Sequence, residues 1–69
     1  MIKTFLLSNI PEFQEILQIE KTDHITLEVE INILTLEYRV YGNNFDLTRQ
    51  DFLGEGVLTK SDWEFISAF

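Results

Sequence analysis

The residues best suited to chemistry in this sequence are one histidine and the acidic side chains near it. His24 is the single imidazole of the chain and follows Asp23, a neighbour that could orient a general base. A nucleophilic hydroxyl would have to come from elsewhere, and the chain contains no Gly-x-Ser-x-Gly elbow. We therefore interpret His24 as a surface or strand-edge residue and predict no catalytic residue.

Metal and phosphate sites are not predicted either. Asn44, Asp46 and Asp51 cluster near an expected loop, but their spacing differs from that of a calcium-binding EF-hand loop. With no cysteine and one histidine, the chain lacks the ligand set of a common zinc site. Its three glycines form no phosphate-cradling motif, and their acidic flanks would repel phosphate. The sequence thus predicts no metal and no cofactor.

The stretch from Ile25 to Tyr41 is expected to position the remaining polar side chains. Apolar and polar residues alternate in it with period two, and the phase changes once, at Ile33-Leu34. Such alternation predicts β-strands with one buried and one solvated face. The expected buried set is Ile25, Leu27, Val29, Ile31, Leu34, Leu36, Tyr38 and Val40. The expected solvated set is Thr26, Glu28, Glu30, Thr35, Glu37 and Arg39.

The phase change has two interpretations. A single strand would need a bulge at Ile33-Leu34 to keep its apolar side chains on one face. A hairpin would place the two runs side by side, and we favour this interpretation. Because Ile33 suits poorly the positive φ that a two-residue type I′ turn demands, we predict a four-residue turn from Asn32 to Thr35.

The segments that flank the hairpin predict further elements. Ile2 to Leu7 is apolar on both faces, which is typical of a central strand. A helix is expected from Pro11 to Glu20, capped by Ser8-Asn9 and laid on the sheet by its apolar side chains. After the turn signal Gly42-Asn43-Asn44, a short helix is expected from Leu47 to Leu53.

The last third of the chain completes the predicted fold. Asp46 is the expected cap of the short helix, and Gly54-Glu55-Gly56 is expected to end it and act as a flexible spacer. Ser61 and Glu64 form an S-x-x-E capping box that opens a terminal helix. The resulting order is β-α-β-β-α-α, which predicts a small α+β fold whose short sheet, with a central hairpin, packs against helices.

Length and composition indicate a single domain spanning residues 1–69. The hydrophobic fraction of 45% is sufficient for a packed core. The apolar run near Met1 is too short for a signal peptide, and no stretch approaches the roughly 20 apolar residues of a membrane span. Because small secreted domains usually need disulfides and this chain has no cysteine, we expect a cytoplasmic location.

The charge balance suggests the class of partner. Twelve acidic and five basic residues give a net charge of −7, which disfavours nucleic acid and anionic membranes and favours a protein with a basic surface. In size and charge the chain is similar to phage-encoded inhibitors that block basic, nucleic-acid-binding surfaces of host proteins, although it shares no motif with them. The sequence therefore predicts a non-enzymatic protein-interaction module, an inhibitor or an accessory protein.

The predicted protein-binding residues come from the hairpin and the terminal helix. Trp63 and Phe65 point in nearly opposite directions on that helix, so we expect one of them to face a partner or a second copy in a homodimer. The full predicted set is Glu28, Glu30, Glu37, Tyr41, Trp63 and Phe65.

Two alternatives remain open. One is a small enzyme or ligand-binding domain that uses His24 and nearby carboxylates, and the other is a homo-oligomeric structural unit. The acidity also has a simpler explanation, because net charge keeps a small protein soluble.

Overall fold

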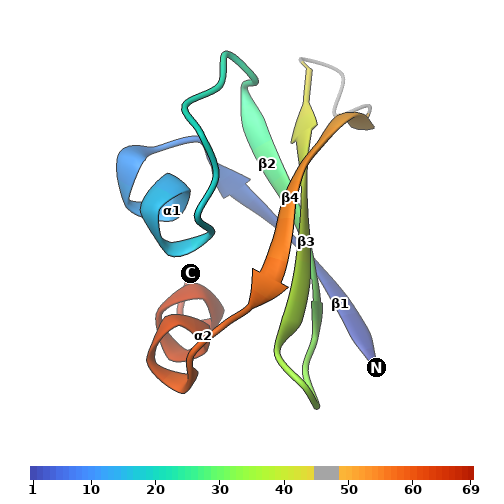
Figure 1. Cartoon of the computed structure of the whole chain (residues 1–69), viewed down its shortest axis with the longest axis vertical. Coiled ribbons are helices and arrows are strands. Elements are labelled where there is room, and N and C mark those ends of the chain that lie inside the picture. Colours follow the sequence, from blue (N-terminus) through green and yellow to red (C-terminus); the bar gives the residue numbers. More distant parts are fainter. Residues whose placement is uncertain (45–48) are drawn as a thin grey trace.

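The structure, a computed structural model, describes residues 1–44 and 49–69. In this part of the chain, a four-stranded antiparallel sheet of order β1-β2-β3-β4 packs against two helices (Figure 1). The strands are β1 (Ile2–Ser8), β2 (Thr26–Asn32), β3 (Glu37–Asn43) and β4 (Arg49–Val57), and the helices are α1 (Pro11–Ile16) and α2 (Lys60–Ser67). Both helices lie on the same side of the sheet (Figure 1), so the fold is a two-layer α+β arrangement.

The central pair of strands, β2 and β3, is the predicted hairpin. Val29 lies opposite Val40 and Ile31 lies opposite Tyr38, and all four side chains are buried. Apolar residues therefore meet across the hairpin on the face that the helices cover, as the period-two alternation predicted. The phase change in the sequence is a turn and not a bulge.

The turn itself lies one residue later than predicted. Asn32 ends β2, and its side-chain oxygen accepts hydrogen bonds from the backbone N–H groups of Leu34 (2.9 Å) and Thr35 (3.3 Å). Leu36 then adopts a positive φ of 65° before β3 begins at Glu37. The asparagine side chain organises this glycine-free turn by supplying the local hydrogen bonds that asparagine commonly makes in turns.

Strand β1 lies at the edge of the sheet, not in its centre as its apolar pattern suggested. It pairs with β2 over its whole length and with no other strand of the described chain. Phe5 and Leu7 face the helices, whereas Ile2 and Leu6 point to the other side and are exposed. The second apolar face of β1 is thus a surface and not part of the core.

Helix α1 is shorter than the predicted span from Pro11 to Glu20. Pro11 occupies its first turn as expected, but the helix ends at Ile16, and Gln18 has a positive φ of 53°. The N-cap is Ile10, which makes no side-chain capping bond, so the predicted cap at Ser8-Asn9 is wrong. Asn9 instead donates hydrogen bonds to the backbone of the loop that follows the helix.

Strand β4 replaces the predicted helix from Leu47 to Leu53. The proposed cap Asp46 and the first two helical positions lie outside the described residues, and the remaining positions are extended. Gly54 and Gly56 belong to this strand and do not form a spacer. A β-carbon at Gly56 would lie 3.0 Å from the Tyr38 hydroxyl oxygen, and one at Gly54 would lie 3.2 Å from Ile19. The two glycines therefore leave space for the side chains of Ile19 and Tyr38, which lie directly against β4.

Gly42 has the same role in β3. It was predicted to begin a turn with Asn43 and Asn44, but the strand continues through Asn43. A β-carbon at Gly42 would collide with the imidazole ring of His24. The close approach of this ring requires glycine at position 42.

The core lies between the sheet and the helices. Its buried hydrophobic residues are Leu7, Phe13, Leu17, Leu27, Val29, Ile31, Tyr38, Val40, Leu58 and Ile66. Tyr38 donates a hydrogen bond from its hydroxyl to the backbone oxygen of Leu17 (2.6 Å), and burial, with the charge of Asp62, raises the pKa of that hydroxyl. Three side chains predicted to be buried are not, since Ile25 is 47% exposed, Leu34 is 81% exposed and Leu36 is only partly buried.

Helix α2 begins with a different cap from the predicted one. Thr59 is the N-cap, and its hydroxyl accepts a hydrogen bond from the Asp62 backbone N–H at 3.0 Å. Ser61, the cap expected from the S-x-x-E pattern, lies inside the first turn.

We expect Thr59→Ala to lower the free energy of unfolding by about 1 kcal/mol, because it removes the capping hydroxyl. Ser61→Ala should change it by about 0.5 kcal/mol or less in urea titrations, and the opposite ranking would contradict this cap.

Candidate functional site

The helices cover one face of the sheet and leave the other uncovered (Figure 1). We call this helix-free side the open face. Alternation along the strands and the cross-strand register assign to it Ile2, Thr4, Leu6, Glu28, Glu30, Glu37, Arg39, Tyr41, Arg49, Phe52, Glu55 and Val57. Four of the six predicted binding residues, namely Glu28, Glu30, Glu37 and Tyr41, lie on this face.

Arg49 connects three strands of the open face. Its Nε donates to Glu28 Oε2 at 2.7 Å, and its Nη2 donates to Glu30 Oε2 at 3.2 Å and to Glu28 Oε2 as well. The guanidinium carbon lies 4.0 Å from the centroid of the Tyr41 ring, a cation–π geometry. Hydrogen bonding to Glu28 raises the pKa of Arg49 above its ordinary value. This side chain therefore holds two carboxylates and one aromatic ring in fixed positions.

An aromatic pair extends this arrangement toward β4. The rings of Tyr41 and Phe52 meet edge to face, with centroids 5.7 Å apart. Phe52 is 54% exposed, so its ring is available to a partner. Arg49 and Phe52 are not among the predicted binding residues, because both lie in the segment from Leu47 to Leu53 that was expected to be a helix. The glycines at alternate positions 54 and 56 removed the apolar side chains that would have revealed a strand.

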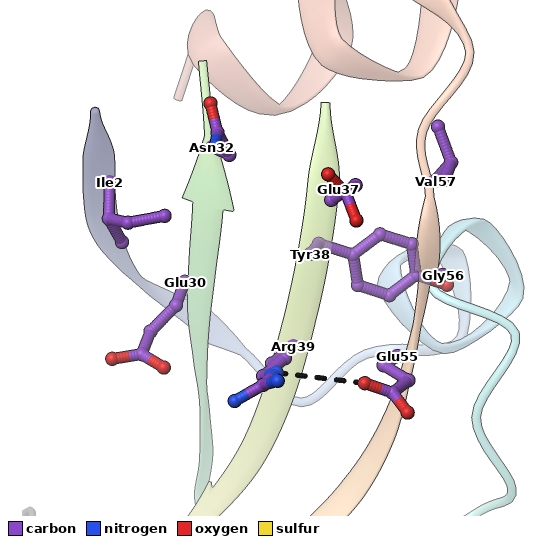
Figure 2. A pocket seen from close by; sticks show the side chains of 9 residues that line it. All are labelled: Ile2, Glu30, Asn32, Glu37, Tyr38, Arg39, Glu55, Gly56 and Val57. Atoms are coloured by element: carbon purple, nitrogen blue, oxygen red, sulfur yellow. Dashed lines mark ion pairs between the residues drawn. The ribbon is translucent and has the colours of Figure 1, made fainter. Parts of the chain in front are cut away.

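A second charged group lies around a hollow at the turn end of the open face. Figure 2 shows Glu30, Arg39 and Glu55 projecting from three neighbouring strands, and Arg39 Nε lies 3.6 Å from Glu55 Oε1. The hollow has a volume of about 480 Å³, and Ile2 and Val57 belong to its lining. Its charged lining thus contains carboxylates from three strands around one guanidinium.

The charge of the open face remains negative after these ion pairs form. Glu28, Glu30, Glu37 and Glu55 supply four carboxylates, and Arg39 and Arg49 supply two guanidinium groups. The carboxylates differ in accessibility, because the side chain of Glu28 is 15% exposed and that of Glu55 is 63% exposed. Glu37 is exposed and makes no ion pair within the described residues.

The two predicted binding residues of the terminal helix lie on the other layer of the protein. Trp63 is partly buried and packs edge to face on Phe5, with ring centroids 5.8 Å apart. Phe65 is 43% exposed and contacts Phe13 and Phe69 at centroid distances of 6.0 and 5.0 Å. The structure therefore divides the predicted binding residues between two surfaces, and Phe65 is the more exposed aromatic residue of the pair.

His24 lies in a polar network that fastens the loop between α1 and β2. Its Nδ1 is 2.5 Å from the Thr22 hydroxyl, and its Nε2 is 3.0 Å from an Asp51 carboxylate oxygen. Asn9 donates to the backbone oxygens of Thr22 (2.9 Å) and His24 (2.7 Å). A hydroxyl, an imidazole and a carboxylate thus stand in line, but the hollow described above is lined by none of them. The network accounts for the fixed position of His24 against Gly42.

The described residues contain no group of three or more histidine, aspartate or glutamate side chains placed so that they could hold a metal ion. Neither of the two helices described has both the length and the apolar character needed to cross a membrane. The sequence matches no protein-family model, and no curated protein or solved structure is significantly similar to it.

Proposed function

We propose that this chain is a small non-enzymatic protein-interaction module whose open face binds an electropositive surface on another protein. The observation that carries the proposal is the composition of this helix-free face. It has more carboxylates than guanidinium groups, and it also exposes the apolar side chains of Ile2, Leu6, Phe52 and Val57. Protein interfaces combine exposed apolar groups with a polar, charge-complementary surround.

The ion pairs within the face strengthen this proposal. Arg49 fixes the position of Glu30, whose side chain stays 29% exposed, so less conformational entropy is lost when a partner's lysine or arginine binds to Glu30. Glu37 and Glu55 are more accessible, and Arg39 lies between strands β2 and β4 that carry the other carboxylates. A basic partner would thus meet carboxylates whose positions are already defined.

The chemistry of the face suggests the class of partner. A phosphate backbone or an anionic membrane would be repelled by the excess carboxylates, whereas a basic nucleic-acid-binding protein would be attracted. The proposed role is that of an inhibitor or accessory protein that occupies such a basic surface, and the proposed location is the cytoplasm. A phage-type inhibitor is one form of this role.

The test compares two variants with the same change in net charge. The first, Glu30→Gln/Glu37→Gln/Glu55→Gln, neutralises the three most exposed carboxylates of the open face. Glu28 is left unchanged because it is largely occupied by Arg49. The matched control, Glu12→Gln/Glu15→Gln/Glu20→Gln, neutralises three exposed carboxylates of α1 and the loop that follows it, away from the open face.

Binding should be measured after capture of a partner from a lysate of the native source. A titration of the purified partner should show affinity that falls as salt shortens the Debye length from ~10 Å at 0.1 M to ~3 Å at 1 M. The open-face variant should associate more slowly than the native chain, while the control should retain most of the native rate. Equal effects of the two variants, or affinity indifferent to salt, would contradict the proposal.

A further inference from the structure

The free edge of β1 has the properties of an intermolecular pairing site. Within the described chain, β1 forms hydrogen-bonded pairs with β2 alone, so its other edge carries unpaired backbone groups. The seven residues of β1 keep an unbroken register with β2. The opposite edge strand, β4, has register shifts at two places in its pairing with β3. Regular edges accept another strand more readily than bulged ones.

The side chains of β1 offer little protection against such pairing. Natural proteins guard edge strands with charged residues, proline or bulges. Lys3 is the one charged residue of β1, whereas β4 carries Arg49, Asp51 and Glu55. On the open face, β1 presents Ile2, which is 58% exposed, and Leu6, which is 54% exposed. An edge of this composition is stabilised when another strand covers it.

We propose that a second copy of this chain pairs with the free edge of β1, forming an antiparallel two-fold dimer. Residues that lie opposite each other in a sheet point to the same face, and successive residues of one strand point to alternate faces. The two paired positions of identical strands must therefore be an even number of residues apart, so the two-fold axis passes through a residue and not between two residues. Centring it on Phe5 pairs the whole strand from Ile2 to Ser8. In this register Thr4 lies opposite Leu6 of the second copy, and Phe5 lies opposite its counterpart.

Charge favours a second copy over a basic partner at this edge. β1 has no carboxylate to attract a cationic strand. Its single cation, Lys3, does not face the Lys3 of the second copy, since in the proposed register the two Lys3 residues are separated by about 13 Å along the strands. The net charge of −7 on each copy is carried by other elements, which leaves the pairing strands free of like-charge contacts.

The helix-side face of the same edge supplies apolar area for the contact. Phe5 and Trp63 pack against each other and remain only partly buried. Pairing about Phe5 brings this aromatic pair toward the same pair of the second copy. Trp63, which the sequence singled out as a partner contact, then serves the interface between copies while Phe65 stays outside it.

The dimer has a consequence for the open face. The two-fold axis stands perpendicular to the sheet, so both open faces lie on the same side of one continuous sheet. That sheet has eight strands, twice the four described for one copy. The inference does not depend on the proposed function, but it would make binding to a repeated basic surface bivalent and therefore tighter.

Sedimentation equilibrium between about 1 μM and 1 mM tests the proposal. The native chain should dimerise with rising concentration. Thr4→Lys/Leu6→Lys places lysines directly opposite one another across the interface, so the dimer dissociation constant should rise at least about tenfold. The matched control, Phe52→Lys/Val57→Lys, adds the same charge at exposed positions of β4 and should dimerise like the native chain. Circular dichroism of each variant checks that the fold is retained.

Three results would overturn the dimer. They are a native chain that stays monomeric at the highest concentration, equal weakening by the two lysine pairs, and weakening by the β4 pair alone. The register has a separate test, because the chain contains no cysteine. Thr4→Cys/Leu6→Cys should form covalent dimers on mild oxidation, whereas Phe52→Cys/Val57→Cys should not. Cross-linking through the β4 pair alone would also exclude the β1 interface.

Discussion

Replacing Val29 with lysine is expected to unfold this protein. Val29 is 0% exposed, and it lies between Phe5 of β1 and Val40 of β3 in the centre of the sheet. A lysine there would bury an ammonium group with no acceptor, at a cost of roughly 4 kcal/mol or more. Because small domains have total stabilities on the order of 5 kcal/mol, little native protein should remain. Circular dichroism and a urea titration would show the loss of the cooperative transition.

Glu37→Lys is the matched control on the other face of the same sheet. Glu37 is exposed and makes no ion pair within the described residues, so its replacement should change stability by about 0.5 kcal/mol or less. Glu28→Lys, which the sequence alone suggests to be equally harmless, should cost more, because it places a cation beside Arg49. Comparable losses for Val29→Lys and Glu37→Lys would contradict the assignment of the two faces.

The part of the fold that could be predicted is the part encoded by local periodicity. The hairpin and its buried face follow from side chains that alternate with period two, because neighbouring residues on a strand point to opposite sides. Leu27, Val29, Ile31, Tyr38 and Val40 are all buried as this rule requires. The terminal helix was also predictable, although its cap was placed at Ser61 instead of Thr59.

The parts that could not be predicted depend on contacts between distant residues. Gly42, Gly54 and Gly56 were interpreted as turn, helix end and spacer, since glycine commonly marks such positions. In the structure they accommodate His24, Ile19 and Tyr38, which approach from other segments of the chain. No local pattern distinguishes a glycine that permits a close contact from one that ends an element. For this reason strand β4 was not predicted.

In the candidate site, too, the residues that follow the local periodicity could be predicted, and those that depend on distant contacts could not. Glu28, Glu30 and Tyr41 could be placed on one face because they share the phase of the hairpin. Their neighbour Arg49 comes from strand β4, which was not predicted. It adds a positive charge to the face, where it pairs with Glu28 and Glu30 and lies over the Tyr41 ring. Glu28 and Glu30 are both held in ion pairs with Arg49, and Glu28 is the less exposed of the two. Glu37 and Glu55 are the most exposed carboxylates of the face, and Glu30 remains partly exposed.

Deleting Trp63 to Phe69 is the second change expected to abolish folding. The deleted segment contains Ile66, which is 0% exposed and belongs to the core, and Trp63, which packs on Phe5. Its loss would also uncover Phe13, whose ring contacts Phe65 and Phe69. A truncated chain should therefore show no cooperative transition in urea, because the core of so short a chain has little apolar area to spare.

Point variants separate the packing of α2 from the mere presence of a helix. Ile66→Ala keeps the helix but removes its buried side chain, and it should cost about 2–5 kcal/mol. Ser67→Ala, at an exposed position of the same helix, should cost about 0.5 kcal/mol or less. If the truncated chain instead unfolds at the native midpoint, α2 is an appendage to the sheet. Its aromatic residues would then have to be explained by binding, because they would contribute nothing to the stability of the fold.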